Sequence, residues 1–161
     1  MRIKRRTRAF SLVELVIVVV IIGVIAAIAV PRISRGAKGA ADSALRGDLA
    51  ALRNSIDLYA AEHSGDFPTE AKFLEQITTY TNDLGGDVAT PDATHIYGPY
   101  LRTIPPLPVA GVGATAGVKG STIVSSTPAA NVGWIYTVLT GTVTANTGTA
   151  EDESTALYTS Y

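Results

Sequence analysis

The pattern of apolar and polar positions divides the chain into two unlike parts. From Phe10 to Val30 every residue is apolar or glycine apart from Ser11 and Glu14. This run reaches the roughly 20 residues that a helix needs to cross the hydrocarbon core of a membrane. Val and Ile are frequent in it, but a segment in lipid must satisfy its own backbone hydrogen bonds, which favours a helix. The pattern therefore predicts a transmembrane or assembly helix over residues 10–30.

Helical periodicity continues beyond this run. Apolar residues recur at spacings of three and four, which places them on one face of a helix: Leu45, Leu49, Leu52, Ile56 and Tyr59. Pro31 predicts a kink, and the glycines that follow it predict a stretch that bends or melts locally as far as Gly47. We therefore expect an amphipathic second half of the helix over residues 31–62, ending near His63-Ser64-Gly65.

Shorter elements are predicted in residues 63–161. Thr69 is a candidate N-cap for a short helix, and polar, Gly-rich composition predicts a loop over residues 82–91. Gly141 predicts a tight turn between the last two of three short strands. The expected ranges are Glu70–Thr79 for the helix and Ser121–Ser126, Val132–Thr140 and Thr142–Ala145 for the strands. The fold class is α+β, in which a long N-terminal hydrophobic helix packs on a small antiparallel sheet.

The charged residues are distributed as unevenly as the apolar ones. Of 13 Lys and Arg residues, five precede Phe10, whereas all 14 Asp and Glu residues follow it. A short basic segment before an apolar run stays on the cytoplasmic side of a membrane, so residues 1–9 are predicted to be a leader. The acidic remainder argues against nucleic-acid binding, which needs clustered Lys and Arg. The chain has no cysteine, so a disulfide framework is excluded.

Glu14 is the unusual residue of the apolar run, because a charge in such a segment is costly. It is either a snorkelling or protonated carboxyl in a plain anchor, or a carboxylate with a cationic partner. Cleavage between Ala9 and Phe10 would create that partner, an α-amino group four residues before Glu14. Opposite charges attract strongly in a low dielectric, although desolvation offsets part of the gain. The amine can belong to the same chain or to a neighbouring copy, and both alternatives stay open.

The segment Arg8-Ala9-Phe10-Ser11-Leu12-Val13-Glu14 with the apolar run after it resembles the prepilin-type signal of type IV pilins and type II secretion pseudopilins. Counted from Phe10, Glu14 takes the fifth place and Pro31 the twenty-second, as in that family. One position departs from the family, because Ala9 stands where Gly is usual. Gly98-Pro99-Tyr100-Leu101 and Gly133-Trp134-Ile135-Tyr136 are similar to segments of major pseudopilins of the G type.

The resemblance implies a pathway and a set of partners. A prepilin peptidase is expected to cut between Ala9 and Phe10 and to N-methylate Phe10, and Glu14 is implied as the assembly residue. The subunit is expected in the bacterial inner membrane as a single-pass protein with its head, residues 63–161, in the periplasm. It is expected to polymerise with itself and with minor pilins or pseudopilins on an inner-membrane assembly platform. The filament would lie in the periplasm or at the cell surface.

The resemblance also bears on cofactors. Many type IV pilins close a C-terminal loop with a disulfide, so the lack of cysteine favours a pseudopilin. G-type pseudopilins often hold calcium in that loop, and the candidate ligands here are Glu151, Asp152 and Glu153. Adjacent carboxylates cannot all face one ion, and the Asp-x-Asp-x-Asp-Gly pattern is missing. A solvated acidic turn is favoured over a calcium site, and no cofactor is expected.

Three other classes of function fit the sequence less well. Ala27-Ile28-Ala29 fits the cleavage site of a secretory signal, but the apolar run is too long for one and contains Glu14. A single-pass tethered or secreted binding domain is a further alternative, which predicts no cut before Phe10. An enzyme is disfavoured, because His63 and His95 are the only histidines and no nucleophile or nucleotide motif is present. A type IV pilus subunit is the alternative nearest to the pseudopilin.

Overall fold

A computed structural model describes residues 10–152 and 154–161, without the side chains of Pro31, Ser34 and Arg35. The expectations for the leader, including the role of Ala9 in cleavage, and for Glu153 lie outside the described residues. The chain divides into two compact units, an N-terminal unit up to Ala37 and a head from Lys38 to Tyr161, and each is described by itself.

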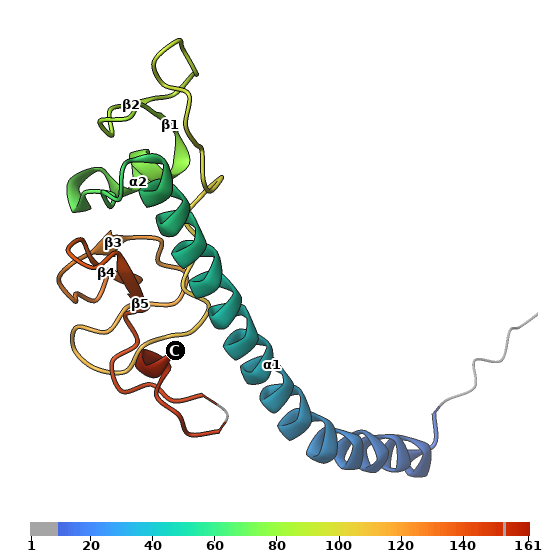
Figure 1. The fold of residues 1–161 in the computed structure, drawn as a ribbon. Coiled ribbons are helices and arrows are strands. Elements are labelled where there is room, and N and C mark those ends of the chain that lie inside the picture. Colours follow the sequence, from blue (N-terminus) through green and yellow to red (C-terminus); the bar gives the residue numbers. More distant parts are fainter. Residues whose placement is uncertain (1–9, 153) are drawn as a thin grey trace, which may run out of the picture. The chain divides into compact units, whose positions relative to one another are not determined.

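One long helix, α1, runs from Leu12 to Glu62 (Figure 1). It stays helical through Pro31 and Gly47, so the expectation of local melting was wrong. The reason is that proline removes a single donor and each glycine costs only about 1 kcal/mol, which an otherwise helical sequence can absorb. The kink at Pro31 stays a prediction. The helix ends as expected, where Ser64 adopts φ 57° and the Gly65 amide donates to Ala60 O at 2.8 Å.

In the N-terminal unit, α1 exposes its apolar side chains over the whole segment Leu12–Val30. By length and composition this segment is able to cross a membrane. An apolar surface of this extent needs lipid or neighbouring helices to cover it.

The head consists of short elements beside the C-terminal half of α1 (Figure 1). In chain order they are a 3₁₀ helix η1 (Glu70–Lys72), α2 (Phe73–Thr78), β1 (Tyr80–Thr81), β2 (Asp87–Val88), β3 (Val124–Ser125), β4 (Trp134–Thr137), β5 (Thr142–Ala145) and a 3₁₀ helix η2 (Tyr158–Ser160). Strands β1 and β2 form an antiparallel pair. The other three form a sheet of order β3-β4-β5, in which β4 and β5 are antiparallel.

The predicted apolar stripe of α1 forms one side of the head's core. All five of its residues are buried: Leu45, Leu49, Leu52, Ile56 and Tyr59. Trp134 and Tyr136 of β4 are fully buried in the same cluster, as the alternation along that strand predicts. The Trp134 indole donates to Pro105 O at 2.8 Å, which satisfies its polar atom. Burial of these side chains joins the sheet to the second half of α1.

Three local predictions were wrong. Strand β3 pairs with β4 in parallel, because the chain turns back through residues 126–133 and re-enters in the same direction. The predicted loop over 82–91 contains β2, which pairs with β1 around a turn at Gly85. Thr69 makes no side-chain cap bond; its amide instead donates to the Gln76 side-chain oxygen at 2.8 Å. Each of these three features depends on a strand or side chain that lies further along the chain than the local pattern used for the prediction.

Candidate functional site

The first turn of α1 holds the residues expected to direct assembly. Phe10 precedes the helix and is exposed, and Ser11 is the residue before the first helical position, Leu12. The Glu14 Oε2 atom accepts the Ser11 amide at 2.8 Å. In return the Ser11 hydroxyl accepts the Val13 amide at 3.3 Å.

These two bonds form a variant of the capping box: the Glu14 carboxylate binds the Ser11 amide, whereas the Ser11 hydroxyl binds the Val13 amide and not that of Glu14. A carboxylate in this turn also interacts favourably with the helix dipole. Glu14 thus has a role in helix initiation that the sequence analysis missed. The signal was available, because Ser11-Leu12-Val13-Glu14 lies at the start of the apolar run.

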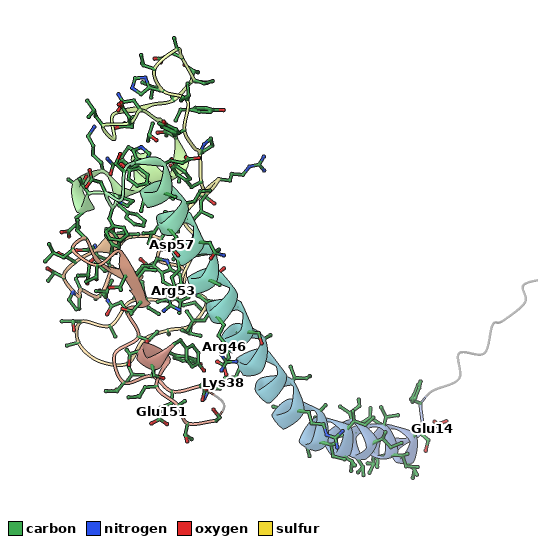
Figure 2. The ribbon with its side chains drawn as sticks, viewed as in Figure 1. Glu14, Lys38, Arg46, Arg53, Asp57 and Glu151 are labelled. Carbon is green, nitrogen blue, oxygen red and sulfur yellow. The ribbon has the colours of Figure 1, made fainter. Side chains whose placement is uncertain are left out.

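The C-terminal acidic segment contacts α1 instead of standing free in solvent. Asp152 is buried and pairs with Arg46 of α1 at 3.2 Å (Arg46, Lys38 and Glu151 are labelled in Figure 2). The Tyr161 hydroxyl also donates to the Asp152 carboxylate, and the Lys38 ammonium donates to the Asp152 carbonyl at 3.0 Å. Glu151 is exposed.

Further bonds within the turn complete the environment of Asp152. Its carboxylate accepts the Ser154 amide at 2.7 Å and the Ala156 amide at 2.9 Å. The Tyr161 and Ser154 side-chain donors are the main cause that holds the pKa of Asp152 well below its usual range. Arg46 also lies over the Tyr161 ring, 4.5 Å from its centre.

Protein donors surround the Asp152 carboxylate on the side chain's two oxygens. Calcium binds six to eight oxygen ligands, and the Asp152 oxygens are already occupied by Arg46, Tyr161, Ser154 and Ala156. Within the part of the chain that the structure describes, no group of three or more Asp, Glu or His side chains is placed to hold a metal. The expected solvated turn was also wrong in one respect, because Asp152 itself is buried.

Comparison with known proteins adds one finding at the N-terminus. The family described as the prokaryotic N-terminal methylation motif matches residues 4–30. The N-terminus is that of a type IV pilin-like precursor. No curated protein and no solved structure matches the chain. The match covers most of the predicted leader and α1 as far as Val30, so it bears on this pilin-like segment and not on the head.

The match and the structure together confirm part of the prediction. The pilin-like N-terminus and the α+β fold are confirmed, whereas similarity to G-type pseudopilins in particular is not. Phe10 and Glu14 lie together at the start of α1, and Glu151 and Asp152 lie in the separate C-terminal segment of the head. Cleavage, methylation of Phe10 and the assembly role of Glu14 stay predictions. Proteins of the pilin-like family are in general structural rather than enzymatic.

Proposed function

We propose that the chain is a structural subunit of a pilus-like filament, a type II secretion pseudopilin that polymerises through α1 after cleavage before Phe10. The observation that carries this proposal is the methylation motif at residues 4–30 joined to an apolar helix long enough to span a membrane. The second half of that helix is amphipathic, and its apolar face packs in the core of the head. The head thus supplies the outer part of each subunit.

The mechanism begins with insertion in the inner membrane. The basic leader stays in the cytoplasm and the head enters the periplasm. A prepilin peptidase removes the leader and methylates the new amino group of Phe10. The Leu12–Val30 segment then leaves the bilayer for a bundle of identical helices on the assembly platform. Because side-chain packing replaces lipid contact, the transfer changes the apolar environment little.

Glu14 supplies the register of the bundle. One carboxylate oxygen binds the Ser11 amide, and the described residues give the other oxygen no partner. That oxygen is available to the Phe10 amine of a neighbouring copy. The attraction energy of a charge pair inside an apolar bundle falls strongly as the two charges move apart. The pair therefore favours one axial offset between subunits. The capping box holds the carboxylate at the helix end where such an amine arrives.

The lack of cysteine favours a pseudopilin over a surface pilus subunit, which is the second candidate. The two are distinguished by removing the gene and measuring both protein secretion and surface filaments. A loss of secretion with no change in surface filaments supports the pseudopilin. A loss of surface filaments alone supports the pilus subunit.

We propose further that the subunit works without calcium or another cofactor. The contacts that support this are those of Asp152 with Arg46 and of Lys38 with the Asp152 carbonyl, which already attach the C-terminal segment to α1. Arg46 thus pairs with the buried carboxylate of the segment in which the family resemblance implied an ion, and Lys38 binds its backbone.

The test of the proposed function is intact mass and N-terminal sequencing of the protein from its native membrane. We expect a chain that begins at Phe10 and carries one additional methyl group. A chain that begins at Val30 would instead indicate a secretory signal peptide, and a retained leader would indicate a plain tether. An Ala9→Gly variant is the matched comparison, since it restores the residue usual before the cut and should be processed at least as completely.

A further inference from the structure

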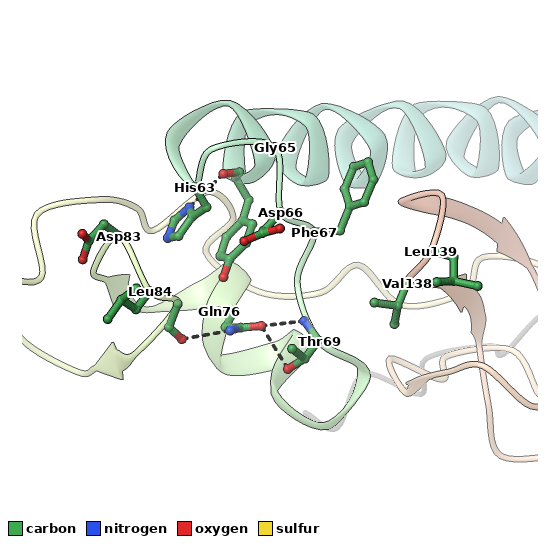
Figure 3. A pocket seen from close by; sticks show the side chains of 12 residues that line it. His63, Gly65, Asp66, Phe67, Thr69, Gln76, Asp83, Leu84, Val138 and Leu139 are labelled. Carbon is green, nitrogen blue, oxygen red and sulfur yellow. Dashed lines mark hydrogen bonds between the residues drawn. The ribbon is translucent and has the colours of Figure 1, made fainter.

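The head contains a cavity of about 490 Å³ that the proposed N-terminal mechanism does not use. It lies between the end of α1 and the turn after it, the β1–β2 loop, and the tip of the β4–β5 hairpin. Figure 3 shows His63, Asp83 and Leu84 toward one side of it and Val138 and Leu139 toward the other. Segments distant in sequence therefore meet around a single opening.

The cavity carries negative charge. Asp66 and Asp83 line it, and both residues are exposed. The ion pairs among the described residues are Arg46–Asp152, Lys72–Asp87 and His95–Asp92. Neither lining carboxylate is therefore neutralised within the described head. These charges also act on Tyr59 in the cavity wall. Burial is the largest cause that raises the pKa of its phenol, and the charges of Asp66 and Asp87 raise that pKa further.

One buried polar atom of the cavity wall has no hydrogen-bond partner among the described residues. His63 is only 2% exposed, and its ring is stacked on Tyr59 with centres 3.8 Å apart. Its Nδ1 lies 2.8 Å from Tyr59 O, and since a carbonyl only accepts, Nδ1 must carry the proton. In the neutral ring Nε2 is then an acceptor, and the described residues give it no donor. The Nε2 atom is itself buried, so the charged groups that the cavity exposes are the carboxylates of Asp66 and Asp83.

The rim of the cavity is apolar. Leu84 is 89% exposed and Leu139 is 92% exposed, which is unusual for two leucines that flank one opening. Phe67 and Val138 line the cavity between them. A long side chain with an aliphatic stem and a cationic head matches this arrangement, because the stem lies on the leucines while the head reaches the carboxylates.

The same chain contains such a side chain. Arg32 belongs to the N-terminal unit, so the candidates are the basic side chains of the head. Lys38, Arg46, Arg53 and Lys72 all donate to acceptors within the head. Arg102 and Lys119 are exposed, and no hydrogen bond or ion pair with described residues engages them. Arg102 follows a fixed backbone, since the amides of Tyr100 and Leu101 donate to Ile77 O at 2.9 and 3.0 Å. A guanidinium can also bind a carboxylate through two parallel N–H donors, which an ammonium cannot do.

We propose that this cavity receives the Arg102 side chain of a neighbouring copy of the chain, with the guanidinium at Asp66 and Asp83. Arg102 does not line the cavity of its own molecule, so the two surfaces belong to different patches of one subunit. A contact between two different patches links copies head to tail, and it generates an open series when the rotation between copies does not close a ring. The inference rests on the proposed filament and deepens it, because it adds a contact between heads to the contact between N-terminal helices.

Cysteine cross-linking in cells that assemble the full-length protein tests this contact. The chain has no cysteine of its own, so Leu84→Cys with Thr103→Cys places one thiol at the rim and one beside Arg102. Oxidation should produce a ladder of disulfide-linked copies from the double variant and none from either single variant. Adding Arg102→Glu should reduce the ladder several-fold, and adding Asp83→Arg to that chain should restore it. Lys119→Glu is the control and should leave the ladder unchanged.

The outcomes separate this contact from the filament itself. If processed chains begin at Phe10 and form filaments but the double variant gives no ladder, the head contact is wrong and the filament stands. A ladder that is unchanged by Arg102→Glu, or that Lys119→Glu reduces equally, also overturns the contact. If even the unaltered chain keeps its leader and forms no filament, the proposed function fails, and the head contact fails with it.

Discussion

The Glu14 carboxylate accepts the Ser11 backbone amide at 2.8 Å, so the residue expected to set the assembly register also caps its own helix. Replacement of Glu14 by alanine would therefore remove two functions together. Glutamine retains a side-chain oxygen for the capping box but carries no charge. The two functions can be separated by this choice of variant.

We predict that Glu14→Gln inserts in the membrane and is processed but assembles poorly, since the amine of a neighbouring copy no longer finds a carboxylate. Ser11→Ala is the matched variant, because it weakens the cap by about 1 kcal/mol and keeps the charge. It should assemble almost normally. Filament yield and N-terminal sequencing measure both effects, and normal filaments from Glu14→Gln would rule out charge pairing.

The core of the head should depend on the buried stripe of α1. Leu52 is fully buried, whereas Leu58 of the same helix is 51% exposed. Leu52→Ala should lower the free energy of unfolding by about 2–5 kcal/mol, and Leu58→Ala by far less, since only the first leaves a cavity. Trp134 is the only tryptophan and is buried, so its fluorescence during thermal unfolding in detergent reports on this core. Equal losses would contradict the assigned helix face.

The C-terminal segment should be held by side chains and not by a metal. Arg46→Gln should lower the midpoint temperature of head unfolding by about a few degrees, because it leaves Asp152 without its guanidinium partner. In the unaltered protein, excess calcium or a chelator should leave that temperature unchanged. Arg53→Gln is a comparison at a neighbouring cation, which donates to Tyr161 O at 2.6 Å and does not contact Asp152. A calcium-dependent rise in the midpoint would contradict the proposal.

The low pKa of Asp152 predicts how the stability of the head responds to acid. Its folded-state pKa is depressed by donors from Tyr161 and Ser154, whereas an unfolded Asp has a pKa of about 3.9. The stabilisation is therefore complete above that pH and is lost as pH falls through the folded-state pKa. Unfolding midpoints measured from pH 7 downward should decline less steeply for Asp152→Asn, which is less stable at neutral pH.

The ionisation of Asp48 should affect the stability of the head in the opposite direction. Partial burial raises its pKa, so its ionised form is disfavoured in the folded state. Its contribution is thus lost as pH rises through the folded-state pKa, and Asp48→Asn should stabilise the head at neutral pH. If both Asn variants shifted the acid profile in the same direction, the assignment of these two carboxylates would be wrong.

Substitution by alanine should change the stability of the head in opposite directions at two glycines. Gly47 lies inside α1, and a Cβ there would meet nothing within 4 Å. Gly47→Ala should therefore raise the free energy of unfolding by up to about 1 kcal/mol. At Gly141 the backbone has φ +64°, and a Cβ would lie 2.3 Å from the Phe67 ring. Gly141→Ala should destabilise the head, as the same thermal measurement would show; a gain in stability there would contradict the left-handed turn assigned to Gly141.

Much of the fold followed from local pattern. The apolar run over residues 10–30, the buried stripe from Leu45 to Tyr59 and the strand Thr142–Ala145 were predicted correctly. These features depend on side-chain period and run length, which the chain order contains directly. The Ser11–Glu14 capping box is equally local, and it was missed only because Glu14 was considered as a charge and not as a capping residue.

What the sequence by itself determined was therefore the pilin-like N-terminus, the length of α1 and the face that it buries. Only the tertiary structure decided that Arg46 pairs with Asp152, that β3 runs parallel to β4, and that Asp66 and Asp83 line one cavity. The physical reason is separation along the chain. A charge or a strand edge finds its partner through the packing of the whole head, and nothing near either residue in the sequence specifies which partner that will be.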